Sequence, residues 1–345
     1  MRTFIIGFTA LFLGLACKKA GEGTGEAARE RVYVSDENGG QLVVIDAAND
    51  DVITRIPVGK RPRGVRVSPD GTHVLVALSG SPKSPPGTDP ASLPPVDRAA
   101  DGIGIIDVSS MKLARVLESG QDPELFDVTR DGKWLWASNE ETAEASLIDV
   151  ESGKVVRRTG VGGEPEGVGI HPDGKHVYVA NERDNSISVV DVESGAAVAL
   201  VPVCGRPRSI AFSPDGQRAF TACEEAQSVA IIDARTRAAA GSVDLPGEGV
   251  RPMGLAVSAD GRELYASGGR GGTVHVIDLV ATPPAVKKTI ENVGQRPWGI
   301  AIATKANKLY TANGGSGDVT VIDLATGTVL RRIAVGGAPW GVAVR

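Results

Sequence analysis

The sequence is poor in the residues on which common metal and cofactor chemistry depends. Aromatic residues make up 4% of the 345 residues, and there are only four His and three Cys. No His pairs with Cys or Glu at a metal-ligand spacing, which argues against a dedicated zinc site. The absence of Cys-x-x-Cys-His excludes covalent c-type haem, and no Gly-x-Ser-x-Gly or P-loop motif occurs. We therefore expect no metal, no cofactor and no assigned catalytic residue.

An excess of positive charge is also lacking. The formal net charge is −5, so the chain has no general electrostatic reason to bind nucleic acid. An apolar fraction of 41% is enough for a packed core. What the chain has in excess is turn formers, 44 Gly and 21 Pro, which interrupt long helices and disfavour a helical bundle.

No apolar run in the N-terminal segment has the ~20 residues that a comfortable membrane-spanning helix needs. Residues 1–16 (MRTFIIGFTALFLGLA) instead combine Arg2, a short apolar run and a small residue before Cys17, which is the layout of a signal peptide. The junction resembles a bacterial lipobox, and this resemblance implies that Cys17 is lipidated, although Gly14 stands where Leu is usual. An ordinary signal peptide cut near residue 16 or 20 is the alternative.

The segment after this signal, residues 17–30, is polar and Gly-rich, as a flexible tether is. Basic residues rather than an acidic residue follow Cys17. We therefore expect an exported lipoprotein on the periplasmic side of the bacterial outer membrane, or at the cell surface. Its contact with the membrane is through the lipid anchor alone.

Residues 31–345 contain one unit repeated seven times. A hydrophobic strand ending in Asp recurs, at Asp46, Asp107, Asp149, Asp191, Asp233, Asp278 and Asp323. A Pro before a short apolar strand recurs in step, at Pro62, Pro123, Pro165, Pro207, Pro252, Pro297 and Pro339. Asp-Gly turns mark five copies. Each unit predicts four short strands, as in residues 167–170, 177–181, 186–191 and 196–203. Four strands in every ~42–45 residues are typical of a propeller blade.

The two ends of the repeated region predict how the ring closes. It begins at a second strand, residues 32–36, and stops just after a first strand, residues 341–345. We predict an all-β, seven-bladed β-propeller whose C-terminal inner strand joins the N-terminal blade. The second blade carries an insertion at residues 79–100, where six Pro predict an extended rather than helical segment, either a lid or docking arm or a tolerated surface insertion.

Several short motifs carry a family resemblance. They are YVAN (178–181), YTAN (310–313), WASN (136–139), DPELF (122–126), SNE (138–140), EPEG (164–167), residues 313–323 and APWGVAV (338–344). These resemble the YVTN-repeat β-propellers, and within them the PQQ-dependent catabolism-associated β-propeller proteins. The resemblance implies an exported propeller, and some such proteins accompany quinoprotein dehydrogenase systems. It implies the fold more firmly than any activity.

The repeated Asp residues have a structural explanation, because an Asp at the start of a turn accepts hydrogen bonds from the backbone beyond it. Two Cys fall outside the repeat pattern. Cys204 ends a fourth strand, and Cys223 takes the Asn place of the next YVxN motif, so both lie on one face. In an exported protein they form either a disulfide or two separate thiols.

The residues that differ from blade to blade are candidates for function. The position after each marker Pro reaches the channel mouth, and around the ring it is occupied by Trp340, Arg63, Glu124, Glu166, Arg208, Met253 and Trp298. The residues before the Pro add Arg61, Asp122, Glu164, Arg206, Arg251 and Arg296. Varied residues on a fixed scaffold are typical of a binding surface. Replacing Trp340 and Arg63 by Ala is expected to abolish ligand binding with little change in melting temperature.

We expect a monomeric, non-enzymatic binding or scaffold protein that takes a protein or small-molecule ligand on this face. One alternative is an accessory partner of a periplasmic quinoprotein dehydrogenase or electron-transfer system. The other is a lactonase-like hydrolase, for which Glu124 and Glu166 are the only nearby acid pair, with no positioned base evident.

Overall fold

The computed structural model describes Met1, residues 30–83 and residues 88–345. The predicted signal peptide (1–16), the lipidation residue Cys17 and the tether (17–30) therefore lie outside the described residues, apart from Met1 and Glu30. The insertion at 79–100 is described except at 84–87. Within the described ranges, no helix is long and apolar enough to cross a membrane.

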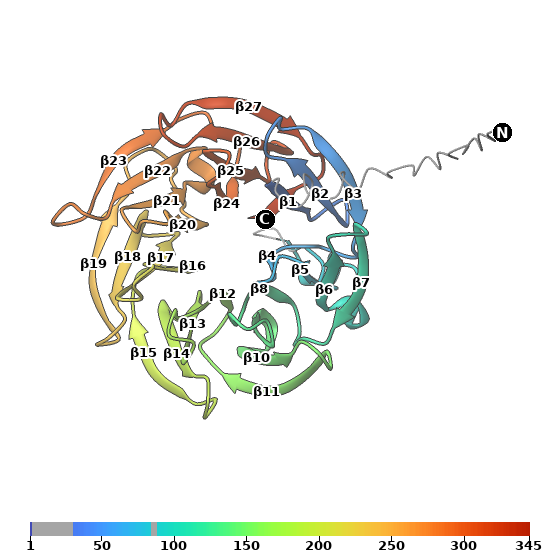
Figure 1. Ribbon diagram of the computed structural model, residues 1–345. Coiled ribbons are helices and arrows are strands. Elements are labelled where there is room, and N and C mark those ends of the chain that lie inside the picture. The colour runs from blue at the N-terminus through green and yellow to red at the C-terminus, as the bar shows by residue number, and fades with distance from the viewer. Residues whose placement is uncertain (2–29, 84–87) are drawn as a thin grey trace.

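Seven sheets of four antiparallel strands stand around a central axis (Figure 1). This arrangement confirms the predicted all-β, seven-bladed β-propeller. We number the blades in chain order, and within each blade the strands run from the axis outward.

Blade 1 combines both ends of the chain, and blades 2 and 3 follow it. Their strands are β28 (Pro339–Val344), β1 (Arg31–Asp36), β2 (Gln41–Asp46) and β3 (Val52–Pro57); β4 (Val65–Val67), β5 (His73–Leu78), β6 (Gly102–Asp107) and β7 (Lys112–Leu117); β8 (Pro123–Val128), β9 (Trp134–Asn139), β10 (Glu144–Asp149) and β11 (Lys154–Gly160).

Blades 4 to 7 repeat the same order without interruption. Their strands are β12 (Pro165–Ile170), β13 (His176–Asn181), β14 (Ser186–Asp191) and β15 (Ala197–Pro202); β16 (Pro207–Phe212), β17 (Arg218–Cys223), β18 (Ser228–Asp233) and β19 (Ala238–Asp244); β20 (Leu255–Val257), β21 (Glu263–Ser267), β22 (Val274–Asp278) and β23 (Ala285–Ile290); β24 (Pro297–Ala303), β25 (Lys308–Asn313), β26 (Asp318–Asp323) and β27 (Val329–Ala334).

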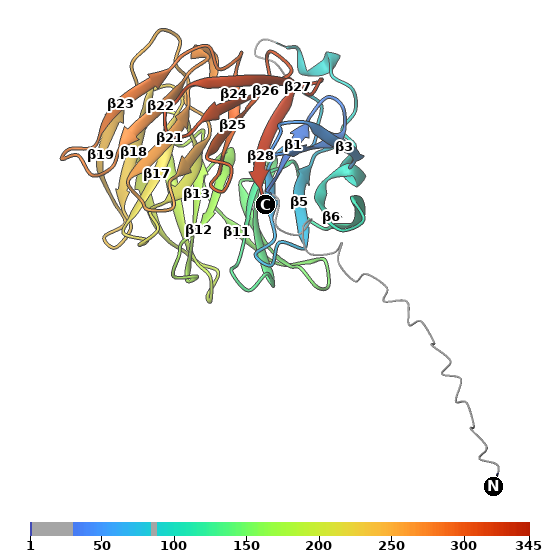
Figure 2. The same ribbon diagram turned by 45° about the horizontal axis from the view of Figure 1, so that its top comes forward.

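Ring closure follows the prediction from the chain ends. Strand β28 pairs antiparallel with β1, with Tyr33 opposite Ala343 and Val34 opposite Val342. Arg31 and Arg345 exchange two further backbone hydrogen bonds of 3.0 and 2.9 Å. Figure 2 shows β28 beside β1, although 300 residues separate them in the chain. Closing the ring in this way removes the open sheet edge that an unclosed array would expose.

One large side chain in each second strand fills the space between neighbouring blades. These residues occupy the same repeat position and are at most 2% exposed: Tyr33, Leu75, Trp136, Tyr178, Phe220, Tyr265 and Tyr310. Full burial of a side chain of this size contributes about 1.5–3 kcal/mol. Much of the small aromatic content is thus used for packing between blades.

The repeated polar residues close turns, as the sequence predicts. The strand-ending Asp side chains accept backbone N–H groups two or three residues on, over 2.6–2.8 Å, from Ala48, Ser110, Ser152, Ser194, Thr236, Val280 and Thr326. In the Asp-Gly turns the glycine has φ near +70°, for example Gly132 and Gly174. Such a φ favours glycine because it has no Cβ.

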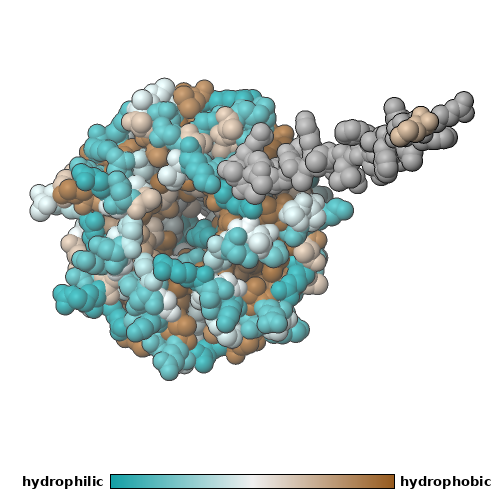
Figure 3. All heavy atoms as spheres, viewed as in Figure 1, coloured by the Kyte–Doolittle hydropathy of each residue, from teal (hydrophilic) through white to brown (hydrophobic). Residues whose placement is uncertain are grey.

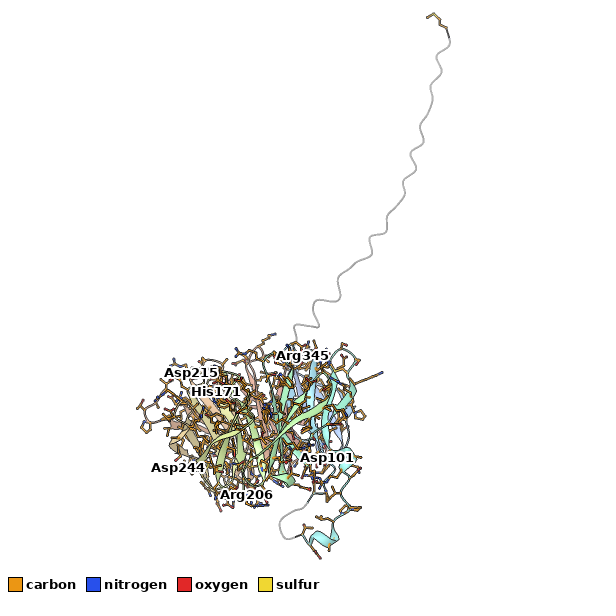
Figure 4. The ribbon with its side chains drawn as sticks, turned by 90° about the horizontal axis from the view of Figure 1, so that it is seen from below. Asp101, His171, Arg206, Asp215, Asp244 and Arg345 are labelled. Atoms are coloured by element: carbon orange, nitrogen blue, oxygen red, sulfur yellow. A yellow bond between two sulfur atoms is a disulfide. The ribbon has the colours of Figure 1, made fainter. Side chains whose placement is uncertain are left out.

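The turns divide the ring into two faces. Figure 4 places His171, Asp215 and Arg345 at one face, with Asp101, Arg206 and Asp244 at the other. The first face carries the Asp-Gly turns, and the second carries the loops from one blade's outer strand to the next blade's inner strand. Figure 3 shows a mainly hydrophilic surface around a hollow at the axis.

The insertion projects from the second face (Figure 4). The sequence predicts an extended rather than helical segment, but the described part of the insertion contains two short 3-10 turns, η1 (Pro90–Ser92) and η2 (Arg98–Ala100). Two more such turns are η3 (Glu140–Thr142) after β9 and η4 (Gly269–Gly271) after β21. A 3-10 turn needs only three residues, so Pro-rich composition does not prevent it.

Candidate functional site

A funnel opens at the face that carries the loops between blades. Its volume is about 930 Å³, within the ~300–1,000 Å³ range of small-molecule sites. Six predicted mouth residues line it: Arg63, Glu124, Glu166, Arg208, Met253 and Trp298. The seventh, Trp340, lies in a narrower space lined also by Trp298, Met253 and the inner strands. The structure therefore brings the predicted residues to one end of the channel.

Neighbouring blades fix the backbone of these mouth residues. A serine hydroxyl near the end of one blade's second strand donates to the mouth carbonyl of the next blade: Ser35 to Arg63 at 2.6 Å, Ser138 to Glu166 at 2.6 Å and Ser267 to Trp298 at 2.7 Å. The Gly64 N–H donates to the Glu124 carbonyl at 3.1 Å in the same way. Contacts between neighbouring blades therefore pre-organise these four positions of the mouth.

Arg63 joins blades 2 and 3 within the funnel wall. Its side chain is 3% exposed and forms an ion pair with Asp122 and a second with Glu124 at 3.2 Å, and the Glu140 carboxyl lies 3.6 Å from its guanidinium. Burial opposes the Arg63 charge, but Glu124 and Asp122 outweigh burial and raise the pKa of Arg63 above its ordinary value. Removing Arg63 would leave buried carboxylates unpaired, so the structure leads us to expect a lower melting temperature for any variant that lacks Arg63.

Arg208 makes the equivalent junction between blades 4 and 5. Its guanidinium pairs with Glu166, Glu182 and Glu224, and its side chain is 12% exposed. Glu124 and Glu166 thus each face an arginine. The sequence suggested these two acids as a pair for hydrolysis, and in the structure each is held in a separate ionic cluster.

A set of carboxylates absent from the predicted site also belongs to the funnel. Glu140, Glu182 and Glu224 line it, and each follows the last residue of a second strand. Their backbone N–H groups donate to the residues that precede the marker Pro: Glu140 to Asp122, Glu182 to Glu164 and Glu224 to Arg206. The signal was available, because Glu recurs at this repeat position directly after the strand.

Glu140 holds its proton near neutral pH. Burial and the neighbouring Glu124 carboxylate raise the pKa of Glu140 to about 8, against the lowering effect of Arg63. The Glu124 side chain is 6% exposed, and its Oε2 is buried without a hydrogen-bond partner among the described residues. A protonated Glu140 can donate a hydrogen bond to such an acceptor.

Charged residues occupy strained backbone positions around the mouth. Before five of the marker prolines, a non-glycine residue has a positive φ of 40–55°: Arg61, Asp122, Glu164, Arg206 and Arg296. A left-handed conformation of this kind costs about 1 kcal/mol or more for most residues, and glycine would avoid the cost. Four of these five residues have a long charged side chain, at positions where glycine would avoid the cost.

The floor of the funnel is apolar on the side of blades 6, 7 and 1. The Trp298 and Trp340 rings meet edge to face with centroids 5.0 Å apart, and the Arg296 guanidinium lies 5.3 Å from the Trp298 ring centroid. Trp340 is 8% exposed, and Met253 is 7% exposed. Trp298 is only half-buried, so part of it remains available for contact.

A disulfide fixes one of the mouth loops. Cys204 and Cys223 are bonded, with Cα atoms 5.6 Å apart. In blades 3, 4 and 7 the residue at the position of Cys223 is Asn, and Asn139 and Asn181 accept the N–H of Gly120 and Gly162 at 2.8 and 3.1 Å. The disulfide therefore replaces a repeated hydrogen bond immediately before Arg206 and Arg208.

The described part of the insertion forms part of the funnel rim. Pro82, Leu93, Pro94, Pro95 and Val96 line the cavity. Lys60 pairs with Asp97 at 2.7 Å, and Arg98 pairs with Glu141. These ionic contacts hold the insertion beside the mouth.

Within residues 30–83 and 88–345, no group of three His, Cys, Asp or Glu side chains is arranged to hold a metal ion. His275 is fully buried between the hydroxyls of Thr273 and Thr289, at 3.0 and 3.3 Å. Burial lowers the pKa of His275 to about 4, which makes it a neutral core residue.

Comparison with known proteins assigns the chain to a family. Residues 27–206, just over half of the chain, match the model of the Choice-of-anchor I domain. The chain belongs to this family. Membership of the Choice-of-anchor I domain family indicates an exported or surface protein. A search of curated proteins gave no match.

Solved structures similar to this Choice-of-anchor I protein share its propeller fold. A functionally unknown protein from Desulfotomaculum acetoxidans has a TM-score of 0.76 at 16% identity, covering 91% of this chain and 98% of its own. A periplasmic gluconolactonase from Pseudomonas aeruginosa has a TM-score of 0.73 at 18% identity, covering 92% and 99%. A hydrazine synthase from Kuenenia stuttgartiensis has a TM-score of 0.69 at 20% identity, covering 81% and 88%. Identities this low show the fold alone.

Proposed function

We propose that this protein is a non-enzymatic, exported binding propeller whose ligand docks in the funnel. The observation that carries the proposal is the set of charged residues in left-handed backbone conformation at the mouth. Strain of this kind clusters at ligand sites, where the side chain matters more than the backbone. The serine anchors and the ionic clusters of Arg63 and Arg208 hold these side chains in place before a ligand arrives.

Retention of a small molecule tests this role. The full chain is isolated without denaturation from the exported fraction of its own cells and weighed by native mass spectrometry. The test variant is Trp298→Leu, and the control is Trp134→Leu, a second half-buried tryptophan at the start of β9 on the opposite face. A bound mass on the wild type and control that is absent from the test variant supports the proposal. The same bound mass on all three proteins contradicts it.

The lactonase alternative is favoured by one feature of the funnel, the Glu140 carboxyl, whose pKa is raised to about 8 by burial and by the neighbouring Glu124 carboxylate. Two solved propellers of this shape are described as a periplasmic gluconolactonase and a putative 6-phosphogluconolactonase. Hydrolysis needs a positioned base and a route for the proton. Turnover of a lactone panel by the wild type, lost in Glu140→Gln, would replace the binding role with this one.

The membrane attachment and the partner are part of the same proposal. Cys17 is the proposed lipid anchor, and Cys17→Ser should release the protein into the soluble exported fraction. The resemblance to PQQ-dependent catabolism-associated propellers supports an accessory role beside a dehydrogenase. Such a role would use the same face, with the insertion as part of the docking rim.

A further inference from the structure

Blades 6 and 7 depart from the charge pattern of blades 1, 3, 4 and 5. Where blades 3, 4 and 5 have Glu after the second strand, these two have Gly269 and Gly314. In blade 7 the Gly314 N–H donates to the Arg296 carbonyl at 3.0 Å, as Glu140 does to Asp122, so this backbone contact is kept there and the carboxylate is missing.

The loss of these carboxylates leaves arginines without ionic partners. Arg251, Arg270 and Arg296 all line the funnel. Within residues 30–83 and 88–345, no carboxylate forms an ion pair with any of them, whereas the guanidinium groups of Arg63 and Arg208 are each within 4 Å of three carboxyl groups. The funnel therefore has an internally compensated side at blades 2 to 5 and a positive side at blades 6 and 7.

This positive side stands beside the apolar floor. Arg296 lies over the half-buried Trp298 ring, and Trp340 packs against the edge of Trp298 below. The narrow space under the funnel is lined by Trp298, Met253, Leu255, Ile300, Trp340 and Val342. Guanidinium groups bind oxyanions through two parallel N–H donors, and indole rings offer flat apolar contact.

We propose that the funnel binds a small molecule with one anionic pole and a flat apolar body. This inference rests on the proposed binding role and specifies its ligand class. The anion lies against Arg251, Arg270 and Arg296, and the flat body lies against Trp298. The opposite wall carries Glu124, Glu166 and Glu182, which disfavour a second anion at the far end of the ligand.

Three matched probes separate the two parts of the ligand. The probe 2-naphthoate has the anion and the flat body, 2-naphthamide has the flat body without charge, and hexanoate has the anion without the flat body. Affinities are measured on the full chain by titration calorimetry and ligand-observed NMR. We expect 2-naphthoate to bind about tenfold or more tightly than either relative, with affinity falling as salt rises.

Variants identify which groups hold the anion. Arg251→Gln and Arg296→Gln should each weaken 2-naphthoate about tenfold and leave 2-naphthamide unchanged. Arg262→Gln is the control. Arg262 is an exposed arginine in the Asp-Gly turn of blade 6, the blade that follows Arg251, and it lies on the opposite face. The affinity of the Arg262→Gln variant for 2-naphthoate should equal that of the wild type.

The outcomes distinguish this inference from the binding role on which it rests. Equal affinity for 2-naphthoate and 2-naphthamide, with both weakened by Trp298→Leu, overturns the anion assignment and leaves funnel binding in place. Unchanged 2-naphthoate affinity in both arginine variants also overturns the anion assignment and leaves funnel binding in place. Failure of all three probes to bind overturns the inference, and the native mass experiment then decides the binding role separately.

Discussion

Trp298 and Trp340 meet edge to face, with ring centroids 5.0 Å apart, across the boundary between the last blade and the blade that closes the ring. They occupy the same repeat position, directly after a marker Pro. Trp340 is almost fully buried, whereas Trp298 is half-buried. The same residue type therefore serves ring closure at one position and faces the funnel at the other.

This difference predicts unequal costs of truncation. Trp340→Ala removes a buried ring from β28, so we expect a loss of about 3–5 kcal/mol in the free energy of unfolding. Trp298→Ala should cost about 1–2 kcal/mol, because its ring is partly solvated already. Chemical denaturation of both variants measures the difference. Equal losses would mean that Trp340 does not secure the closing strand.

Arg63→Ala should destabilise the protein by about 3–5 kcal/mol, because Asp122 and Glu124 would remain buried without their counter-charge. The control is Arg183→Ala, which breaks an exposed pair with Glu164 and should cost under about 0.5 kcal/mol. Both are measured by thermal unfolding at low and high salt. A loss for Arg63→Ala no larger than for the control would contradict the buried cluster.

Glu140 predicts a specific pH dependence of stability. Its folded pKa of about 8 exceeds the ordinary value of 4.5, so the folded state holds a proton that the unfolded state has lost between these values. The stabilisation is fully present below pH 4.5 and is lost as pH rises through 8. Glu140→Gln should therefore be more stable than the wild type at pH 9 by about 1 kcal/mol, after allowance for partial exposure.

The two proteins should have nearly the same stability at pH 5, since Gln then resembles the protonated acid. Melting curves collected from pH 5 to 9 test this. A constant difference across the range would show that Glu140 titrates as an ordinary exposed acid.

The Cys204–Cys223 disulfide closes a loop with a sequence separation of 19 residues. Replacing both Cys by Ser should lower stability by about 3 kcal/mol. The double variant Cys204→Gly, Cys223→Asn should recover about 1 kcal/mol of this, because it restores the hydrogen bond made by Gly120 and Asn139 in blade 3. Glycine is needed there, since a Cβ on Gly120 would lie 2.1 Å from the Asn139 side chain.

Melting temperatures of the two double variants and the wild type, with and without reductant, check the role of this bond. Reductant should lower the melting temperature of the wild type and leave the melting temperatures of both double variants unchanged. Two free thiols in oxidised, exported protein that is denatured in a blocking reagent would show that the bond does not form.

Much of the fold could be predicted from the sequence because the repeat fixes it. Asp149 and its six equivalents mark the strand ends, and Pro165 and its equivalents mark the inner strands, so seven blades and their closure follow from spacing. The position of Arg63, Glu166 and Trp298 at one mouth follows from strand direction in the same way.

The partners of these side chains could not be predicted, because they lie in other blades. Arg63 meets Glu140, and Arg208 meets Glu182, through rotamers and distances that no repeat spacing encodes. Spacing brought Cys204 and Cys223 to one face but did not decide between a bond and two thiols. The insertion contains local turns that its Pro content alone does not indicate.

Hydrogen–deuterium exchange can show whether the ligand binds in the funnel or on the opposite face. Exchange of the full chain is measured with and without a protein-free small-molecule extract of the exported fraction. We predict slower exchange in the mouth segments 60–64, 122–126, 164–168, 206–210 and 296–300 when the extract is present. Protection confined to the Asp-Gly turns at residues 131–132, 173–174 and 215–216, with the mouth segments unchanged, would contradict it.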